Sequence, residues 1–256
     1  MPGRIQSVER AAAILRLLAG GARGLALAEI SRSLELPKGT VLGILRTLQH
    51  VGFVKQDPDS GLYQLGGSVL RLGTRYLDGN ELRTHALNWA DSLAARSGES
   101  VRIGTLHEDQ ILIVHHVFRP DDSRQSLEVG TLLPLHATAL GKVLLACDPH
   151  ASPETHQPDT ELAEFTRNTI TDVAVLQQEL TEARANGWAR EREELVAGEV
   201  AFAAPIWDRR GTSVGAIGIR GAIERLYEHD KPRMDQVSYV RDAARAISRE
   251  LGATPW

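Results

Sequence analysis

Residues 36–48 read Leu-Pro-Lys-Gly-Thr-Val-Leu-Gly-Ile-Leu-Arg-Thr-Leu, and this stretch decides the fold of the first part of the chain. Pro37 suits the first turn of a helix, where its missing N–H group costs no hydrogen bond. Four apolar residues then recur at the spacing of one buried helical stripe: Val41, Ile44, Leu45 and Leu48. The stretch therefore predicts an amphipathic helix that ends near Gly52.

Two further helices and a hairpin are predicted around this helix. Ser7 is a candidate N-cap for a helix that Gly20-Gly21 ends, and a second, shorter helix is expected from near Ala26. Extended runs at 53–56 and 62–65 flank a segment dense in turn formers, which indicates a β-hairpin. Three helices followed by a hairpin predict a winged helix-turn-helix in residues 1–66, whose third helix would enter the major groove of DNA.

Charge is divided unevenly along the chain. Residues 1–79 carry 10 Lys and Arg against 6 Asp and Glu, a net charge of +4, so residues 80–256 carry −8 within the total of −4. This asymmetry is expected of a protein that meets phosphate with one end only.

The face of the third helix opposite its apolar stripe is polar and basic. Its Lys and Arg side chains can pair with phosphate or guanine, and its Thr side chains can contact phosphate or a thymine methyl group. An N-terminal arm can reach the minor groove, and the wing can touch the DNA backbone. The predicted contacts with double-stranded DNA are Arg4, Lys38, Thr40, Val41, Gly43, Arg46, Thr47 and Lys55. The alternative is a solvated basic face on a winged helix that binds protein.

Residues 67–79 predict a linker helix, and residues 80–256 predict a second domain. In that domain, helices and strands mix without strict alternation, which favours an antiparallel sheet flanked by helices, an α+β fold. Strands are expected at 100–106, 111–118, around Leu127 and Val129, and at 188–192, 199–207 and 213–221. Helices are expected from Leu82 to about Gly98 and at 138–147, 173–186 and 232–251.

Several classes of protein are disfavoured. No apolar run approaches the roughly 18 residues of a membrane span, and the opening residues hold no signal-peptide core, so we expect a cytoplasmic protein without membrane contact. Gly141-Lys142 lacks the Ser/Thr and the leading Gly of a phosphate-binding loop. His115-His116 lies in an apolar strand without spaced partner ligands, and Cys147 is expected to be inert packing. We therefore expect neither an enzyme nor a cofactor or metal site. An enzyme with an accessory winged helix and a constitutive architectural DNA-binding protein remain the alternatives.

Several runs resemble a known family. Residues 5–18, residues 36–48 and the following Gly52-Phe-Val are similar to the isocitrate-lyase-regulator (IclR) family of transcription factors, and so are residues 133–142 and 187–208. The resemblance covers essentially the whole chain. Residues 76–83 and 115–125 more narrowly resemble the glycerol-operon regulators of actinobacteria. The chain departs from the family at Gly43, where many members carry Arg, and at Arg220, where relatives often place a small polar residue.

The resemblance implies a ligand-responsive DNA-binding regulator, a repressor of a carbon-catabolic operon, with a GAF/profilin-like antiparallel-sheet effector domain. It implies a linker helix that contributes to dimer contacts, and a homodimer or dimer of dimers. The implied effector residues are Leu133, Ala139, Leu140, Glu191, Glu199, Ala201, Gly218 and Arg220.

Arg220 leaves two interpretations open. Its guanidinium can hold an anionic effector, glycerol 3-phosphate or another small anion, with Arg102 as a second cation, or it can pair with Glu191 or Glu199. Free N–H groups where the helix opens at 137–142 can hold an anion as well.

Overall fold

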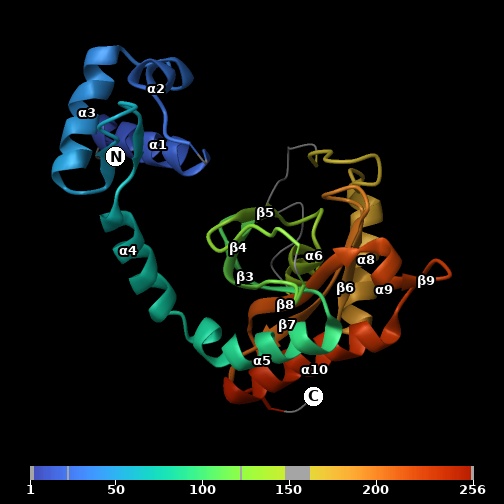
Figure 1. Ribbon diagram of the computed structural model, residues 1–256. Helices are drawn as coiled ribbons and strands as arrows, with labels where there is room; N and C mark the ends of the chain where they lie inside the picture. The colour runs from blue at the N-terminus through green and yellow to red at the C-terminus, as the bar shows by residue number, and fades with distance from the viewer. Residues whose placement is uncertain (1–2, 22, 122, 148–161, 255–256) are drawn as a thin grey trace. The chain divides into compact units, whose positions relative to one another are not determined.

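The computed structural model describes residues 3–21, 23–121, 123–147 and 162–254. The chain divides into two compact units, residues 1–79 and 80–256, which are described in turn below (Figure 1). No helix in the described ranges is both long enough and apolar enough to span a membrane.

The first unit is a winged helix-turn-helix, as predicted. Its elements in chain order are α1 (Gln6–Ala19), α2 (Leu27–Ser33), α3 (Lys38–His50), β1 (Val54–Gln56), β2 (Tyr63–Leu65) and α4 (Gly67–Asp78). β1 and β2 pair antiparallel as the wing, and Leu25 and Tyr63 exchange backbone hydrogen bonds of 2.9 and 2.8 Å that tie the start of α2 to the wing. Ser7 does not cap α1, because the helix already begins at Gln6 with Ile5 in the N-cap position.

One apolar cluster holds the first unit together. It joins buried residues from α1, α2, α3 and both wing strands: Ile14, Leu18, Ile30, Val41, Leu45, Leu48, Val54 and Tyr63. Of the stripe predicted on α3, Val41, Leu45 and Leu48 belong to this cluster, and Ile44 packs against it. Truncating one such buried Leu or Ile to Ala costs a typical core about 2–5 kcal/mol, so single truncations in this cluster should strongly destabilise the unit.

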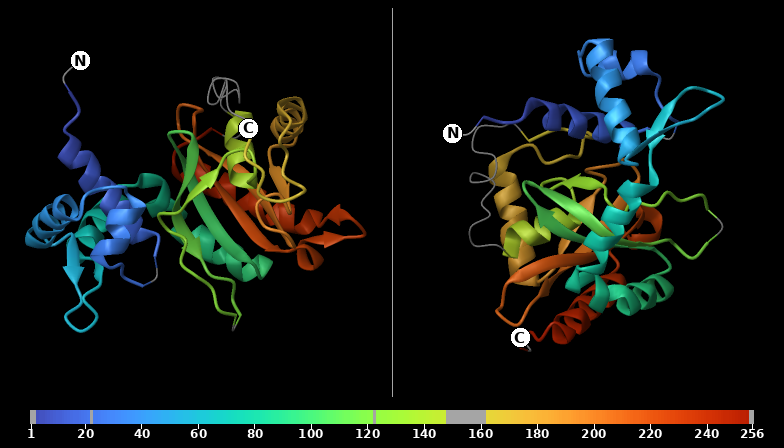
Figure 2. Two further views of the ribbon diagram at one scale, coloured as in Figure 1. Left: turned by 90° about the horizontal axis from the view of Figure 1, so that it is seen from above. Right: turned by 90° about the vertical axis from the view of Figure 1, so that its left-hand side faces the viewer.

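The second unit is built on a six-stranded antiparallel sheet in the order β5-β4-β3-β8-β7-β6. Its strands are β3 (Ser100–His107), β4 (Gln110–Val117), β5 (Leu132–Pro134), β6 (Ala189–Arg192), β7 (Glu199–Trp207) and β8 (Ser213–Ala222). Its principal helices are α5 (Glu81–Ser97), α6 (Ala139–Cys147), α8 (Val173–Asn186) and α10 (Met234–Glu250). α5 and α10 cover one face of the sheet, and α6 with α8 covers the other (Figures 1 and 2).

Side-chain and glycine caps set the ends of two of these helices. Asn80 caps α5, and its Oδ1 accepts a hydrogen bond of 2.8 Å from the Arg83 N–H. Asp172 caps α8, and its Oδ1 accepts from the N–H groups of Ala174 and Val175 at 2.7 and 3.2 Å. Gly187 ends α8 at φ +71°, a left-handed conformation that glycine adopts without steric cost.

Two expectations about the second unit were wrong. Residues around Leu127 and Val129 form no strand, because the Glu128 N–H is directed to the His116 ring and Gly130 turns the chain at φ +88°. The edge strand is β5 instead, which pairs with β4. The closing helix begins at Met234 rather than Pro232, because Pro232 lies in β10. Three short elements were not predicted: α9 (Ile223–Leu226), β9 (Tyr227–Glu228) and β10 (Lys231–Pro232).

Candidate functional site

The outward face of α3 is polar and open. Lys38, Arg46 and Thr47 are exposed there, and Thr40 is half-buried at its edge. The Thr47 Oγ1 donates a 3.1 Å hydrogen bond to the Gly43 carbonyl, so this hydroxyl can still accept from a partner. A Cβ placed on Gly43 would meet nothing within 4 Å, so the middle of the face is free of neighbouring side chains.

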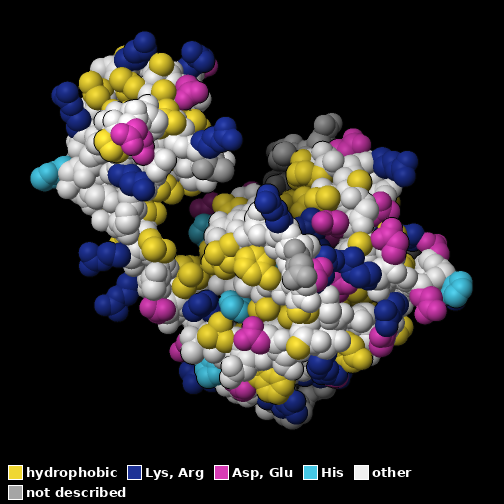
Figure 3. Space-filling model, viewed as in Figure 1, with side chains coloured by type: hydrophobic (Ala, Val, Ile, Leu, Met, Phe, Trp, Pro, Cys, Tyr) yellow, Lys and Arg dark blue, Asp and Glu magenta, His cyan; other side chains and the backbone are white. Residues whose placement is uncertain are grey.

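The remaining predicted DNA contacts divide into exposed and buried residues. Lys55 is exposed on the wing, and Arg4 is exposed before α1, with its Nη1 3.8 Å from Glu9 Oε1. Val41 corrects the prediction, because its side chain is fully buried in the core of the first unit. It lies in the apolar stripe on the opposite side of α3, where a duplex cannot reach it. Figure 3 shows Lys and Arg side chains spread over the surface of this unit.

In the second unit, strand register gathers polar side chains on the face that α6 covers. Residues paired directly across strands project to the same face. One row runs His116, Arg102, Gly218 and Ala203, and the next runs Ser100, Arg220, Ala201 and Glu191. The two arginines therefore lie on the same face of neighbouring strands. A Cβ on Gly218 would lie 2.6 Å from the Phe202 carbonyl oxygen, so this glycine is needed for the close approach of β7 to β8.

A small cavity of about 20 Å³ lies between this face and the start of α6. Seven of the eight predicted effector residues line it: Leu133, Ala139, Leu140, Glu191, Ala201, Gly218 and Arg220. The eighth, Glu199, lies outside the cavity and lines a neighbouring polar cleft of about 400 Å³. Arg102 and Arg220 line both spaces and form the wall between them.

Sequence reasoning missed five residues that line the small cavity: Thr138, Leu195, Phe202, Ala203 and Ile219. Ala203 could have been found, because it lies two positions after Ala201 on the same strand and so faces the same side. Thr138 lies directly before α6, where its Oγ1 accepts a 3.1 Å hydrogen bond from the Gly141 N–H. One of the N–H groups expected to hold an anion at this helix start is therefore already bonded.

Glu191 is the acidic residue of the small cavity. Its side chain is buried, and Oε1 accepts hydrogen bonds from the N–H groups of Glu194 and Leu195 at 2.8 and 3.3 Å. Desolvation outweighs these bonds and raises the pKa of Glu191 to about 7. The carboxyl group therefore exchanges its proton near neutral pH and can either donate to or accept from a ligand oxygen.

Arg220 contacts Glu199 in an ion pair, and its Nη1 lies 3.5 Å from Glu128 Oε1. Arg102 makes a two-point contact with Glu128, with Nε 2.5 Å from Oε2 and Nη2 2.7 Å from Oε1. Burial lowers the pKa of both guanidiniums, and their mutual repulsion lowers that of Arg220 further. A guanidinium nonetheless keeps its charge in a protein, so the wall between the two spaces is positively charged and balanced by carboxylates.

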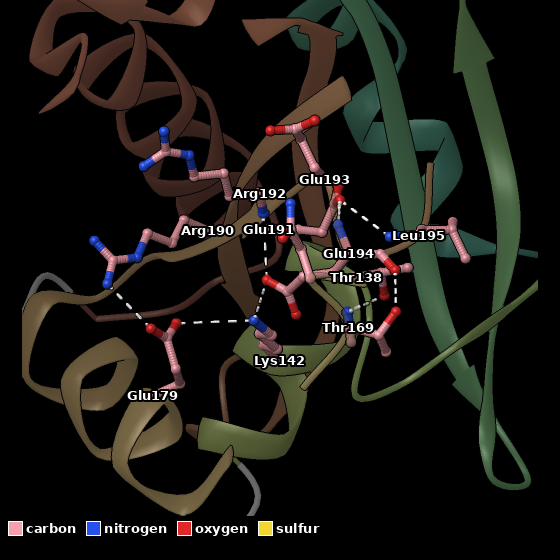
Figure 4. Close-up of polar contacts among 12 residues, drawn as sticks. Thr138, Lys142, Thr169, Glu179, Arg190, Glu191, Arg192, Glu193, Glu194 and Leu195 are labelled. Atoms are coloured by element: carbon pink, nitrogen blue, oxygen red, sulfur yellow. Dashed lines mark hydrogen bonds and ion pairs between the residues drawn. The ribbon is translucent and has the colours of Figure 1, made fainter. Parts of the chain in front are cut away.

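A buried network of polar side chains fixes the turn at Glu194, which in turn binds Glu191 (Figure 4). Lys142 Nζ lies 2.7 Å from Glu194 Oε1 and 3.8 Å from Glu179 Oε2, and Thr169 Oγ1 donates to the Glu194 carbonyl at 2.6 Å. Lys142 therefore holds the turn whose N–H groups bind Glu191, and it does not act as the lysine of a phosphate-binding loop.

The histidine pair and the cysteine singled out in the sequence show no sign of reactive or metal-binding chemistry in the part of the chain that the structure describes. His116 is buried against Arg102 and Glu128, while His115 lies on the other face near α5. Desolvation raises the pKa of the Cys147 thiol to about 11, so little of it is in the reactive thiolate form. No group of three or more His, Cys, Asp or Glu that could hold a metal ion occurs among the residues placed by the structure.

Comparisons with known proteins agree with this architecture. The family model described as IclR helix-turn-helix domain matches residues 7–58, and the model described as bacterial transcriptional regulator IclR C-terminal matches residues 74–249. The chain is 56% identical over 253 residues to the glycerol operon regulatory protein of Streptomyces coelicolor, covering 99% of both chains. It is 33% identical to the HTH-type transcriptional repressor AllR of Escherichia coli, covering 96% of this chain and 90% of the repressor.

Two solved structures show the same fold. The IclR transcriptional regulator of Alicyclobacillus acidocaldarius superposes with a TM-score of 0.82 at 28% identity, covering 96% of this chain and 99% of that one. An IclR homolog from Microbacterium hydrocarbonoxydans, solved in complex with 4-hydroxybenzoate, gives 0.80 at 22% identity, covering 97% and 100%. At that identity, the second match shows the fold alone.

Proposed function

The chain belongs to the IclR family of bacterial transcriptional regulators, and from this premise we propose that it represses a glycerol operon until a small anionic effector binds its second unit. The family and the relatives are DNA-binding regulators rather than enzymes. Repression is supported by the name of the AllR relative, and the glycerol operon by the name of the Streptomyces coelicolor relative. Repression of an operon also implies a cytoplasmic site of action.

Residues 1–66 form the proposed DNA-binding domain. The recognition surface is the outward face of α3 with the wing and the N-terminal arm, and its proposed contacts are Arg4, Lys38, Thr40, Gly43, Arg46, Thr47 and Lys55. The open face and the net charge of +4 on residues 1–79 support this assignment. Val41 is excluded from the set because it is buried.

Residues 80–256 form the proposed effector-binding and oligomerisation domain, joined by the linker helix at 67–79. The observation that carries the effector proposal is the pair of guanidiniums, Arg102 and Arg220, on the wall of a cavity and a cleft. Their planar, fixed charges suit a phosphate or carboxylate group, and glycerol 3-phosphate is the proposed effector. The other proposed effector contacts are Leu133, Ala139, Leu140, Glu191, Glu199, Ala201 and Gly218.

A homodimer, or a dimer of dimers, is the proposed assembly. One recognition helix reads too few base pairs for useful specificity, so two copies are expected on one operator. The apolar stripe of α4, formed by Val69, Leu70, Gly73, Tyr76 and Leu77, supports this, because Leu70 and Tyr76 leave 73% and 55% of their surface exposed in a single chain.

Binding to the duplex upstream of the protein's own gene tests the proposal. Affinity is measured against a scrambled duplex at about 150 mM salt, where screening of surface charge is physiological. Selective binding that glycerol 3-phosphate weakens is the expected result. Selective binding that ignores the compound would remove it as the effector, and binding without selectivity would contradict the operator assignment.

The matched variants are Arg46→Ala on α3 and Arg245→Ala on α10, both of which remove one exposed arginine. Arg46→Ala should weaken operator binding by about 1–3 kcal/mol if the arginine contacts a base edge. Arg245→Ala should leave it unchanged.

A further inference from the structure

The cavity and the cleft on either side of Arg102 and Arg220 differ greatly in size. The inner cavity, about 20 Å³, has room for about one water molecule. The outer cleft, about 400 Å³, has the size of a small-molecule site. A phosphate group, with five heavy atoms, fits the cleft and does not fit the cavity. The anionic end of a ligand held by these arginines must therefore lie on the cleft side.

Glu128 already occupies the position of a bridging anion in the cleft. Its carboxylate makes two contacts with Arg102, at 2.5 and 2.7 Å, and its Oε1 lies 3.5 Å from Arg220 Nη1. This two-point geometry is the one that arginine offers to carboxylate and phosphate ligands. Glu128 thus neutralises part of the positive charge that would otherwise attract a ligand.

Glu128 and Glu199 differ in how firmly the backbone holds them. Glu199 lies on β7 and is paired in the sheet with Ala222. Glu128 belongs to residues 118–131, which connect β4 to β5 without forming a helix or strand among the residues described there. Its N–H donates to His116 Nδ1 at 3.3 Å, and the next backbone bonds to β4 are those of Gly130 and Thr131 with Ile113. The Glu128 carbonyl also accepts from the Thr131 N–H at 2.9 Å, so both backbone bonds of Glu128 lie outside the sheet, whereas the backbone of Glu199 is fixed within it. Side-chain rotation can take the Glu128 carboxylate out of the cleft, and its backbone can follow without loss of a strand pairing.

We infer that the cleft outside the small cavity is an anion-binding site, in which the phosphate of a phosphate monoester bridges Arg102 and Arg220 by displacing Glu128. This inference rests on the proposed function, because it specifies how the effector domain holds its ligand. Displacement of Glu128 removes its contacts with Arg102, so ligand binding is coupled to release of residues 123–128.

Charge favours a phosphate monoester over a monocarboxylate. A monocarboxylate exchanges one negative charge for another and gains nothing over the tethered Glu128. A phosphate monoester carries more than one negative charge at neutral pH and offers three oxygens, so it can contact both guanidiniums fully. The site thus favours a ligand that carries more negative charge than the Glu128 carboxylate.

Glu128→Gln in the full-length chain is the primary test, because it removes the internal competitor and keeps the shape of the side chain. Glu182→Gln, a half-exposed carboxylate 3.8 Å from Arg190, is the matched control. The double variant Arg102→Met, Glu128→Gln removes both charges of the pair, a replacement that buried ion pairs often tolerate. The probes are glycerol 3-phosphate, inorganic phosphate and glycerol, measured by calorimetry.

Glu128→Gln should bind glycerol 3-phosphate and inorganic phosphate about tenfold more tightly than the natural chain, since a charged competitor is gone. The affinity for glycerol should not increase in Glu128→Gln. The double variant should bind the two phosphate probes no more tightly than the natural chain does, and Glu182→Gln should bind them as the natural chain does. Trypsin provides a second readout, because Arg124 is exposed in the connecting segment. Cleavage after Arg124 should accelerate when glycerol 3-phosphate binds the natural chain.

Two results would overturn the inference and are distinguishable from each other. If glycerol 3-phosphate releases operator DNA but Glu128→Gln binds it no more tightly and trypsin cleavage is unchanged, the displacement of Glu128 is wrong and the proposed function stands. If operator binding is intact but neither phosphate probe binds the natural chain or Glu128→Gln, the anion site fails together with the proposed effector.

Discussion

Glu191 and Arg220 lie in one row across β6, β7 and β8, yet burial affects the two side chains differently. A guanidinium keeps its charge at every physiological pH, whereas a buried carboxyl group can become neutral. Arg220 therefore supplies permanent attraction for an anion, and Glu191 supplies a proton whose presence depends on pH. Each property leads to a separate prediction.

Arg220→Gln should abolish the response of operator binding to glycerol 3-phosphate. Charge-assisted hydrogen bonds to an anion are worth about 1.5–3 kcal/mol each, so the loss of a guanidinium should weaken effector binding on the order of 100-fold. The measurement is the operator affinity as a function of glycerol 3-phosphate concentration. Arg192→Gln, which removes a partly exposed arginine paired with Asp230, is the control and should respond normally. A full response from Arg220→Gln would exclude the arginine as an effector contact.

The raised pKa of Glu191 predicts a loss of stability with rising pH. The folded-state value of about 7 lies above the ordinary 4.5, so folding favours the protonated form. The stabilisation is complete below pH 4.5 and is lost as pH rises through about 7, with a total of about 3 kcal/mol. The test compares the free energy of unfolding of the natural chain and Glu191→Gln between pH 4.5 and 8. Their difference should change across this window, and parallel curves would contradict the prediction.

At the scale of single elements, the N-cap of α8 allows the contribution of one capping side chain to stability to be measured. Asp172→Ala removes the acceptor of two N–H groups and should lower the free energy of unfolding by about 1 kcal/mol. Asp172→Asn keeps a side-chain oxygen and should retain most of the stability. Chemical denaturation of the second unit measures both. Equal losses in the two variants would show that charge, rather than the cap oxygen, is what matters.

The apolar stripe of α4 predicts where the chain meets a second copy. Tyr76→Glu places a charge in the stripe and should weaken self-association at least tenfold, because a buried unpaired charge is costly. Arg75→Glu introduces the same residue on the polar side of the helix, one turn from Arg71, and is the control. Sedimentation at a series of concentrations measures the association constant. A stable dimer of Tyr76→Glu would place the interface elsewhere.

Elements with strong local signals were predictable from sequence, and those set by tertiary contacts were not. The stripe of α3 and the glycine after α8 mark their helices directly, and both helices are where the pattern placed them. Leu127 and Val129 alternate as a strand would, but the ring of His116, distant in sequence, takes the intervening N–H group. The pattern of residues 127–129 alone does not show that His116 takes the N–H group that a strand partner would otherwise bind. The short β9 and β10 pair over only two residues each, too few to produce a periodic signal.

The candidate site divides in the same way. Family resemblance and strand periodicity together point to most of the lining of the small cavity. The pairing of Arg102 with Glu128 joins a buried strand to an irregular segment 26 residues later, and neither composition nor spacing indicates it. Val41 is among the predicted DNA contacts, although its place in the apolar stripe of α3 indicates burial. Its side chain is buried in the core, as the stripe indicates.

For the whole molecule, effector and operator should oppose each other reciprocally. If glycerol 3-phosphate lowers the affinity for the operator by some factor, the operator must lower the affinity for glycerol 3-phosphate by the same factor. Calorimetric titration of the effector with and without a saturating operator duplex measures the second factor, and DNA titration measures the first. A scrambled duplex is the control. Unequal factors would show that the protein changes its assembly state during one of the two titrations.

The empty space around Gly43 has a consequence for how this protein diverges from its relatives. Glycine inside a helix is about 1 kcal/mol less favourable than alanine, and a side chain added here displaces no neighbour. Many single-codon changes at this position should therefore be neutral or beneficial for folding, so the fold itself exerts no purifying selection on it. Gene duplicates can acquire new target sites through this position without first accumulating compensating mutations.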